Sequence, residues 1–505
     1  MDKNLLWAVV LSIGVYALWF GVIDKRLPKP AAPTTSAALA SAIAPSAASV
    51  RESASGPSSA AKDSEQLQAE SSPLATPAAR LLIHPQGAGV ISCLYNAPLG
   101  AVELVHDPHP GLFATWPELI FKQEGARYAA SRPDGLRIVK EFLPEGPDTL
   151  PRIRILLSNP TRRPIETGEW SMSVGPGLDT VPTEMKDNQK SLRALGFLAG
   201  EGAAQGKIEV FKPGAHAGAY RWVGVDNRYF LAAMLAPAGE DFNPVQSSLP
   251  AQVALQARSA TLLPGQERVY EIPYYLGAKG QTWLTRYRCG LERSIDFGFF
   301  AQVGRFILRV LNRIHRVTGN WGWSIVIMTF LMQALLFPLT FKSMKAMTAM
   351  KKLQPELSKL QQKYAKDPSR LNAETMELYK KSGTNPLSGC LPLLIQMPIF
   401  IALFNALRNA WEIHGAPWIF WVHDLSAKDP FYVLPVLMGG VMFLQNRMNP
   451  AATSDPTQKT MMTFMPIIFT VMFLSSPSGL VLYWLTSSIL SAAIQMALKN
   501  RLEKA

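Results

Sequence analysis

The sequence predicts a polytopic α-helical membrane protein that crosses the bilayer six times and also carries a large β-sandwich domain outside it. Three observations predict this fold. The 505 residues are 48% hydrophobic and only 17% charged, with a mean hydropathy of +0.08, which is too apolar for an ordinary soluble enzyme and too polar for a chain lying wholly in lipid. Apolar runs of about 17 to 25 residues, the length that spans a bilayer, occur near the N-terminus and repeatedly after Trp321. Between these two regions, short segments alternate polar and apolar residues, the period of half-buried strands.

The expected spans are apolar stretches bounded by polar or charged residues. They are Asn4 to Ile23, Trp323 to Phe341, Leu387 to Leu407, Phe431 to Leu444, Met461 to Leu474 and Leu480 to Leu498. A cleaved signal peptide is the alternative for the first run, because Lys3 precedes it and small residues lie downstream. Its apolar core is longer than the roughly 7 to 15 residues of a signal, so we expect residues 1–27 to be an uncleaved anchor.

Two segments of different composition follow the first span. Residues 28–79 are rich in Pro, Ala and Ser, which bury too little apolar surface to offset the entropy of ordering, so we expect a flexible tether. Residues 80–291 contain alternating stretches that predict the β-sandwich domain. Examples are "RIRILL" (152–157), "KIEVFK" (207–212) and "RVYEIPYYLG" (268–277).

Residues 292–320 are expected to form an amphipathic helix at the membrane surface. Arginines recur there at spacings of three and four, which places them in one stripe of a helix and suits the lipid headgroup layer. They are Arg305, Arg309, Arg313 and Arg316. An ordinary surface helix of the β domain is the alternative. The second span then occupies residues 321–341.

The distribution of positive charge predicts the orientation in the membrane. The segment between the second and third spans is densely basic, and Lys or Arg also follow the fourth and sixth spans, whereas the other two loops carry almost none. Because positive residues stay on the cytoplasmic side, both termini and the basic segment are expected in the cytoplasm and the β domain outside. Lys25, Arg26 and Lys29 oppose this orientation, but long translocated domains are largely indifferent to the rule.

The basic segment, residues 342–384, is expected to form a helical hairpin in the cytoplasm. Its apolar residues repeat at the alternating spacing of three and four that a coiled coil uses, and a "KDPS" turn precedes a return helix. The repeat consists of Met350, Leu353, Leu357, Leu360 and Tyr364. A solvated loop that only anchors topology is the alternative to a role in receiving partners. Residues 385–498 then hold the third to sixth spans, and residues 499–505 a short basic cytoplasmic tail.

The motifs of the C-terminal region resemble those of one known family. They are "GNWGWSIVIMTF", "FPLT", "LQPELSKLQQKY", "ELYKKSGTNPLSGCLPLLIQMPIFIALF", "WVHDLSAKDPFYVLPVLMG" and "MTFMPIIFTVMFLSSPSGLVLYW". In this order and spacing, from about residue 319 to 502, the chain resembles the YidC family of membrane-protein insertases in its six-span Gram-negative form. The β domain resembles that family more weakly, through "RWVGVDNRYF" (221–230).

The resemblance implies a bacterial inner-membrane protein whose last five spans form a groove open to the cytoplasm and to lipid, with the β domain in the periplasm. Hydrophilic parts of nascent membrane proteins would pass through that groove, alone or beside the Sec translocon. No enzymatic activity and no cofactor are implied, and the sequence has no G-x-x-x-x-G-K-[ST] loop for a nucleotide. Because few residues follow Lys499, we do not expect a ribosome contact through a long basic tail.

Uncharged polar side chains inside the predicted spans are the candidate groove residues. Gln333 stands where the family usually places one arginine, so the resemblance implies a polar groove without a fixed charge. Thr329 lies one turn away on the same helix face. The full set is Thr329, Gln333, Gln396, Thr470, Ser487 and Ser488. Ordinary packing is the alternative, because Ser and Thr often bond their own helix and Gln bridges helices.

The resemblance also implies that a substrate helix slides along the third and fifth spans, with the sixth beside them. The residues mapped to this contact are Leu394, Met397, Phe400, Met472 and Trp484. Flexible methionine thioethers suit a surface that meets many apolar partners.

Other functions and sites receive less support from the sequence. A solute transporter or channel predicts internal repeats or charges inside the spans, and neither is found in the sequence; a membrane-anchored periplasmic chaperone is a third reading. "HDPH" (106–109) hints at a metal, but a Pro-bounded loop is the plainer interpretation. Cys93 and Cys289 are left open as a disulfide pair, and Cys390 is expected to pack within a span.

Overall fold

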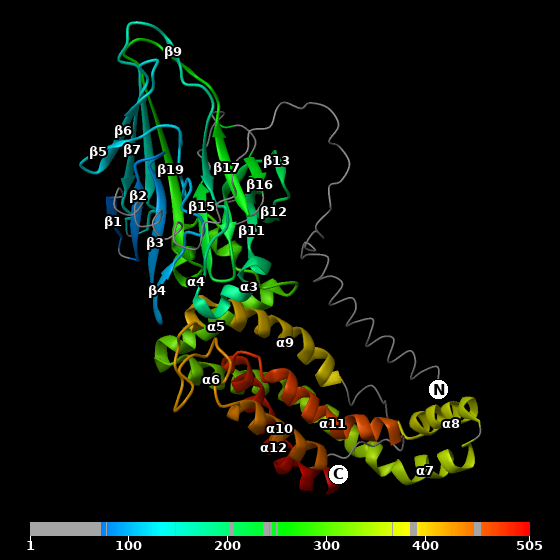
Figure 1. The fold of residues 1–505 in the computed structure, drawn as a ribbon. Coiled ribbons are helices and arrows are strands. Elements are labelled where there is room, and N and C mark those ends of the chain that lie inside the picture. The colour runs from blue at the N-terminus through cyan, green and yellow to red at the C-terminus, as the bar shows by residue number, and fades with distance from the viewer. Residues whose placement is uncertain are drawn as a thin grey trace, which may run out of the picture. The chain divides into compact units, whose positions relative to one another are not determined.

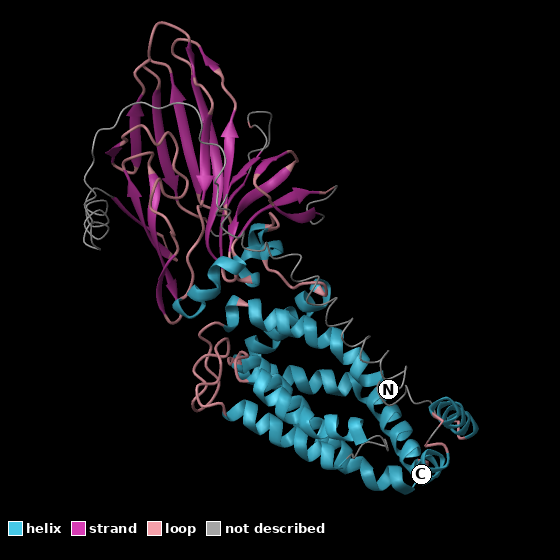
Figure 2. Ribbon diagram, turned by 45° about the vertical axis from the view of Figure 1, so that its right-hand side comes forward, coloured by secondary structure: helices cyan, strands magenta, loops and turns pink. Residues whose placement is uncertain are grey.

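The structure is a computed structural model. It describes residues 72–504 apart from residues 77, 147, 201–205, 236–241, 243–244, 249–250, 366, 384–390 and 449–455. These residues form a β-rich domain followed by a helical region (Figures 1 and 2). The expected anchor, residues 28–71 of the expected tether, and Cys390 lie outside the described residues. The prediction that the tether extends to residue 79 is wrong, because Ser72–Ala75 form strand β1, which pairs with β2 of the β domain.

The β domain is built mainly from three antiparallel sheets. The first contains β1 (Ser72–Ala75), β2 (Ala79–His84), β3 (Gly89–Ala97) and β4 (Gly100–Glu103) in chain order. The second has the order β10 (Trp170–Val174), β17 (Gln252–Ala257), β16 (Val245–Ser248) and β13 (Gly214–His216). The nine-stranded third sheet has the order β12 (Gly206–Val210), β11 (Arg193–Ala199), β14 (Tyr220–Asp226), β15 (Phe230–Leu235), β19 (Glu267–Ala278), β8 (Arg152–Ser158), β7 (Arg137–Leu143), β6 (Arg127–Ser131) and β5 (Lys122–Glu124). A small pair joins β9 (Ile165–Glu166) and β18 (Thr261–Leu262).

The alternation of the sequence accounts for these strands. In β8 the side chains of Ile153, Ile155 and Leu157 are buried, while Arg152 and Arg154, which alternate with them, face outward and pair with Glu271 of β19. Strands predicted at 152–157, 207–212 and 268–277 are confirmed as β8, β12 and β19. Buried residues from all three large sheets form one shared apolar core.

The helical region follows the β domain in the chain. Several short helical elements still belong to the β domain. They are the helices α3 (Met185–Ser191) and α4 (Gln281–Leu284) and the 3-10 turns at Pro182–Glu184, Thr285–Tyr287 and Leu291–Ser294. The later helices are α5 (Ala301–Thr318), α6 (Trp321–Lys352), α7 (Gln354–Lys363), α8 (Pro368–Lys381), α9 (Leu391–Asn409), α10 (Val433–Met448), α11 (Pro456–Phe473) and α12 (Ser478–Lys504), with a further 3-10 turn at Trp411–Ile413. Helix α12 packs mainly on α6, α9 and α10, and α11 packs mainly on α10 and also contacts α12 through aromatic side chains.

Two described helices, over Trp321–Met350 and Ser478–Leu498, are long and apolar enough to cross a membrane, and Thr463–Phe473 is a shorter apolar helix. This supports a helical membrane core. The predicted count of six spans remains a prediction.

The helix expected to end near Phe341 instead continues to Lys352 as part of α6. The chain turns at Leu353, and α7 then begins with Pro355 in its first turn. The predicted coiled-coil repeat is therefore interrupted, because Met350 belongs to α6 and only Leu357 and Leu360 belong to α7. Helices α7 and α8 pack on each other and form the hairpin itself.

Helix α5 is amphipathic, as predicted, but it begins at Ala301 and ends before Gly319, which has a left-handed backbone. Its buried face, which includes Ile307, Leu308 and Leu311, packs against α6 and α9. Arg309 lies on the exposed side of the helix. This arrangement places α5 against the helical region and leaves its basic side free.

The C-terminal end of α9 is joined to the β domain by specific contacts. Arg228, in the turn between β14 and β15, donates hydrogen bonds to the carbonyl oxygen of Arg408 at 3.0 and 2.7 Å. Just beyond α9, the ring of Trp411 is buried in the core of the β domain, 5.0 Å from the ring of Phe230 and 6.0 Å from that of Tyr95. Asn409 also donates to the carbonyl oxygen of Asp296, at 2.6 Å. These contacts fix one end of the helix that carries four of the predicted site residues, Leu394, Gln396, Met397 and Phe400.

Candidate functional site

Gln333 forms a polar bridge between α6 and α12. Its side-chain amide donates to the hydroxyl oxygens of Ser487 at 2.7 Å and of Ser491 at 3.3 Å. Its Oε1 atom is not buried and has no hydrogen-bond partner among the described residues. An amide oxygen without a partner is costly in hydrocarbon, so this half-buried side chain requires water or a polar ligand beside it.

A second bridge joins α9 to α12. The amide of Gln396 donates to the hydroxyl oxygen of Tyr483 at 2.5 Å, and Gln396 is half-buried. Its Oε1 atom, like that of Gln333, has no partner within the described part of the chain. Tyr483 and Ser487 lie one turn apart on α12, so both bridges meet the same face of that helix.

The other predicted polar residues make mainly local packing contacts. Thr329 has no exposed surface, and its hydroxyl donates to the carbonyl oxygen of Ile325 at 2.7 Å, so it lies behind the surface that Gln333 reaches. Thr470 is half-buried and bonds the carbonyl oxygen of Pro466. A Cβ atom at Gly439 would lie 2.0 Å from the Thr470 hydroxyl, so this side chain faces α10. The side chain of Ser488 is buried, and its carbonyl oxygen accepts a bond from Gln445 of α10 at 2.8 Å.

The predicted substrate-contact residues form an apolar surface beside these bridges. The ring of Phe400 on α9 lies 4.8 Å from that of Trp484 on α12, in an edge-on contact. Met397 on α9 and Met472 on α11 are 43% and 46% exposed. Leu394 belongs to α9, but its side chain is outside the described residues. The structure thus brings Phe400 and Trp484 together and leaves the two methionines accessible.

Helices α9 and α11 meet through a ring of α12. The main contacts of α9 are with α5, α6 and α12, and those of α11 are with α10. The rings of Phe469 and Phe473 on α11 also lie 5.6 and 5.5 Å from that of Trp484, which Phe400 of α9 contacts as well. Helix α11 also leaves several large apolar side chains exposed, namely Phe464, Ile467, Ile468, Val471 and Met472. An unpartnered apolar face suits contact with lipid or with an incoming apolar helix.

Sequence reasoning missed two residues of the polar contacts, Tyr483 and Gln445. Tyrosine in an apolar run resembles ordinary filler, although Tyr483 shares a face with Ser487 at the spacing of one turn. Gln445 falls one position beyond the predicted end of the fourth span, at Leu444, whereas α10 continues to Met448.

The cysteine pair left open by the sequence does not form. Cys93 and Cys289 are both free thiols. The Cys93 side chain points into the β-domain core, where burial raises the pKa of the thiol far above its usual value. Burial also raises the pKa of Cys289, to about 11, so both thiols stay protonated at neutral pH.

The "HDPH" loop pairs internally and with a neighbouring loop. His106 contacts Asp179 at 2.7 Å, and Asp107 accepts a hydrogen bond from the backbone N–H of His109. Within the described residues no group of three or more His, Cys, Asp or Glu side chains could hold a metal ion.

Comparison with known proteins gives matches along most of the chain. The family model described as 60Kd inner membrane protein matches residues 313–505, and that described as YidC periplasmic domain matches residues 203–311. A protein from Endomicrobium trichonymphae named "Membrane protein insertase YidC" is 38% identical over 427 residues, which cover 80% of each chain. A protein of the same name from Magnetococcus marinus is 42% identical over 288 residues, covering 56% of this chain and 52% of that relative. A solved structure described as "Active YidC insertase crystal structure with the first transmembrane domain resolved" is 17% identical, with a TM-score of 0.42, and covers 84% of this chain and 92% of that one.

Proposed function

The chain belongs to the YidC family of membrane protein insertases, and we propose that it acts as an insertase for nascent inner-membrane proteins. Hydrophilic segments of a client pass along a polar, water-accessible face of α12, and the client's apolar helix leaves into lipid between α9 and α11. The observation that carries this proposal is the pair of uncharged bridges, Gln333 to Ser487 and Gln396 to Tyr483, each of which leaves an amide oxygen open beside exposed apolar helix surface.

The energetics explain why such a face helps insertion. A charged side chain at the centre of a bilayer costs about 2.5 to 3.5 kcal/mol on insertion scales, so a short tail with several charges faces a large barrier. Water held by amide and hydroxyl groups shortens the dry part of the path. Transfer of the client's apolar span into lipid then supplies about 25 cal/mol for each Å² of apolar surface removed from water, and no nucleotide is required.

The absence of a fixed charge shapes the mechanism proposed for this chain. Gln333 occupies the position where the family usually has arginine, and its amide donates to two serine hydroxyls rather than to a carboxylate. A mechanism in which a groove arginine attracts acidic client tails does not suit this site. We propose instead that tails of either sign are accommodated by water.

The finer architecture forms part of the same proposal. It comprises six spans, both termini in the cytoplasm, a β-sandwich domain in the periplasm, α5 in the outer headgroup layer, and the hairpin of α7 and α8 as a receiving element for clients. The proposed partners are nascent membrane proteins and the Sec translocon. The relatives do not support the alternative of a solute transporter or channel.

A client series with graded charge tests the proposal. Purified protein in liposomes receives single-span clients whose short outer tails carry either no charge or several charges, and protease protection of the tail measures insertion. In the double variant Gln333→Leu with Gln396→Leu, we expect insertion of the charged-tail client to fall about tenfold or more, and insertion of the uncharged client to change little.

A matched substitution controls for general damage. Thr340→Val removes one polar group from the same helix, α6, at a residue whose hydroxyl bonds only its own backbone, so both clients should insert normally. An equal loss for the charged and the uncharged client in the double variant would show that the bridges hold the helices together rather than carry hydrophilic segments.

A further inference from the structure

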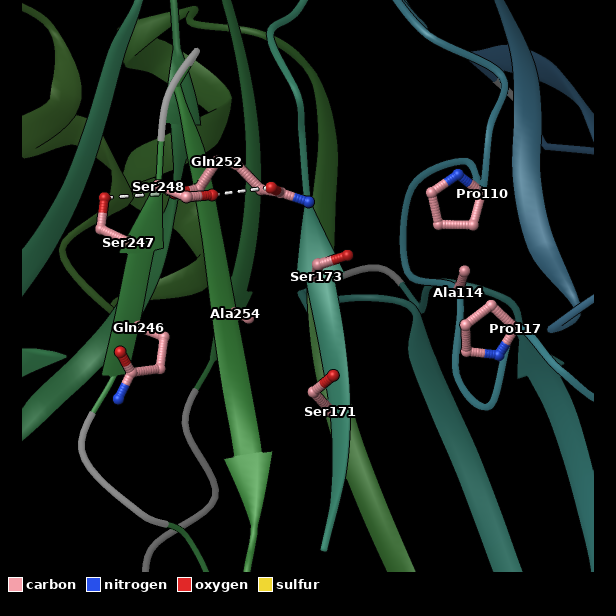
Figure 3. A pocket seen from close by; sticks show the side chains of 10 residues that line it. All are labelled: Pro110, Ala114, Pro117, Ser171, Ser173, Gln246, Ser247, Ser248, Gln252 and Ala254. Carbon is pink, nitrogen blue, oxygen red and sulfur yellow. Dashed lines mark hydrogen bonds between the residues drawn. The ribbon is translucent and has the colours of Figure 1, made fainter. Parts of the chain in front are cut away.

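Two hollows on the surface of the described residues differ in the charge they offer to a ligand. One, of about 350 Å³, lies where strands β10, β17 and β16 face a loop at residues 110–117 (Figure 3), and none of its ten lining residues carries a charge. The backbone N–H of Phe113 in that loop already donates to the carbonyl oxygen of Ser173 in β10, and the buried ammonium group of Lys140 holds the loop through the carbonyl oxygen of Phe113 at 2.6 Å. The other hollow, of about 270 Å³, is a groove on α5 whose lining includes two arginines. Of these two hollows, only the groove on α5 presents charge.

The groove runs between two rows of side chains on α5. Phe306, Val310 and Ile314 follow one another at spacings of four residues and form an apolar row, and Arg309 and Arg313, also four apart, form a basic row beside it. Val310 and Ile314 are half-buried, whereas Phe306 is 57% exposed and both arginines are exposed. The groove therefore has an apolar floor and a rim that is apolar on one side and positively charged on the other.

The basic row has no acidic partner in the part of the chain that the structure describes. No carboxylate there lies within salt-bridge distance of Arg309, Arg313 or Arg316, and residues 297–355 contain no Asp or Glu. The Nε atom of Arg309 donates to the carbonyl oxygen of Arg305 at 3.4 Å, which leaves the terminal nitrogens of its guanidinium group without a bond. Because the positive-inside rule places basic residues in the cytoplasm, topology does not explain such a row on the outer side of the membrane. These donors are therefore available to an external anion.

Aromatic side chains next to the groove indicate the level of a membrane surface. The ring of Trp321 stacks on that of His315 in α5, with centroids 3.9 Å apart. Trp323 is 47% exposed and its ring lies 5.8 Å from that of Trp418, while Phe420 in the same loop is 81% exposed. Tryptophan is enriched at the boundary between lipid and water, and large exposed apolar rings are stabilised when lipid covers them. The groove therefore ends beside a group of rings that is typical of this boundary.

We propose that the groove on α5 binds one anionic phospholipid of the outer leaflet. Arg309 and Arg313 lie about 6 Å apart along the helix axis, close enough for both guanidinium groups to donate to one phosphate. An acyl chain of the same lipid covers the apolar row that begins at Phe306. A zwitterionic phospholipid binds more weakly, because its own ammonium group offsets the charge of its phosphate. This site rests on the placement of α5 in the outer headgroup layer, which is part of the function proposed above, and adds a specific lipid ligand to it.

Native mass spectrometry of the purified full chain in detergent measures this site directly. The probe is phosphatidylglycerol, and phosphatidylcholine with the same acyl chains is the zwitterionic comparison. We expect the first phosphatidylglycerol to bind about tenfold or more tightly than phosphatidylcholine, and the double variant Arg309→Gln with Arg313→Gln to lose this preference. The matched control, Arg162→Gln with Arg163→Gln, removes two exposed charges from the β domain and should change the affinity for phosphatidylglycerol less than about twofold.

Two further measurements separate a lipid site from a simple anion site. Phe306→Gln keeps both arginines but removes the apolar rim, so it should weaken phosphatidylglycerol binding about threefold or more. Glycerophosphoglycerol, the same headgroup without acyl chains, should not displace the lipid at equal concentration.

Equal affinity for the two lipids, or unchanged phosphatidylglycerol binding in the double arginine variant, would overturn the proposal. Unchanged binding in Phe306→Gln, or displacement by glycerophosphoglycerol, would equally overturn it by showing that the acyl chain takes no part. Because no client protein is present, a negative result here leaves the proposed insertase function standing, and a negative insertion assay leaves the lipid site standing.

Discussion

Replacing Gln333 by leucine separates a packing role from a role in solvating the proposed groove. In the structure the Gln333 amide makes one short bond, to Ser487 at 2.7 Å, and one longer bond, to Ser491 at 3.3 Å. Hydrogen bonds between helices in membranes contribute about 0.6 kcal/mol on average and at most about 1.7 kcal/mol. Leucine keeps most of the side chain's volume. We therefore expect Gln333→Leu to lower the free energy of unfolding by about 1 kcal/mol.

Unfolding of the purified protein by SDS, followed by circular dichroism, measures this change. Ser487→Ala and the double variant complete a thermodynamic cycle, in which we expect a coupling energy of about 0.6 kcal/mol between the two side chains. A coupling near zero would show that the 2.7 Å contact between Gln333 and Ser487 contributes nothing to stability.

Insertion should respond to the same position in a different way. Gln333→Leu is expected to reduce insertion of charged-tail clients, whereas Gln333→Arg is expected to be tolerated, since a guanidinium can donate to the same serine hydroxyls and remain hydrated. A destabilisation by leucine of about 3 kcal/mol or more with normal insertion, or a misfolded arginine variant, would refute the reasoning and make Gln333 a packing residue.

Three other perturbations test separate parts of the molecule. Burial lowers the pKa of Lys140 from 10.5 to about 7. Between these two pH values the unfolded chain therefore holds a proton on Lys140 that the folded chain lacks. The free energy of unfolding of the β domain should then rise with pH by up to about 1.4 kcal/mol per pH unit. Thermal unfolding followed at several pH values should show this rise in the native chain but not in the Lys140→Met variant. If stability changes with pH in the same way in both proteins, Lys140 is not the group responsible. Trp411→Ala should lower the free energy of unfolding of the β domain by about 3 to 5 kcal/mol, and Trp411→Phe should lower it by less. An unchanged melting temperature in the alanine variant would show that the Trp411 ring does not stabilise the core of the β domain. Replacement of residues 354–381 by a short Gly-Ser linker should abolish insertion while circular dichroism shows the remaining helices intact, and full activity would make the hairpin a passive loop.

The strands of the β domain were predictable because their signal is local. In β8, apolar residues alternate with Arg152 and Arg154, and this period alone predicts both the strand and its buried face. The loop at residues 110–117 was not predictable, because its backbone is held by groups that are distant in the sequence. Lys140 and Trp170, which hold the loop, lie well beyond it in the sequence, and no local pattern reveals that they meet it.

The boundary between α6 and α7 was predicted at the wrong residue because a change of polarity was taken for the end of a helix. The change from apolar to basic residues at Lys342 indicates where the chain is expected to pass from lipid to water, but the helix does not end there. The lysines, methionines and alanines that follow are good helix formers, and α6 continues to Lys352. The break comes where Pro355 removes a backbone donor and restricts the residue before it.

The polar residues of the helices were predictable one helix at a time, but their partners were not. Periodicity placed Gln333 and Thr329 on one face of α6, yet only the tertiary packing shows that the first meets α12 and the second lies buried. Gln396 and Tyr483 are 87 positions apart, and nothing local to either residue indicates the other.

Labelling of single cysteines tests the central claim most directly. In a chain whose own three cysteines are replaced, cysteine is introduced at Gln333 or Gln396, with buried Thr329 as the control, and a membrane-impermeant thiol reagent is added from the cytoplasmic side. A water-accessible polar face predicts reaction at 333 and 396 and protection at 329. If the reagent reaches neither 333 nor 396, water does not enter between these helices, and the proposed route for hydrophilic segments does not exist.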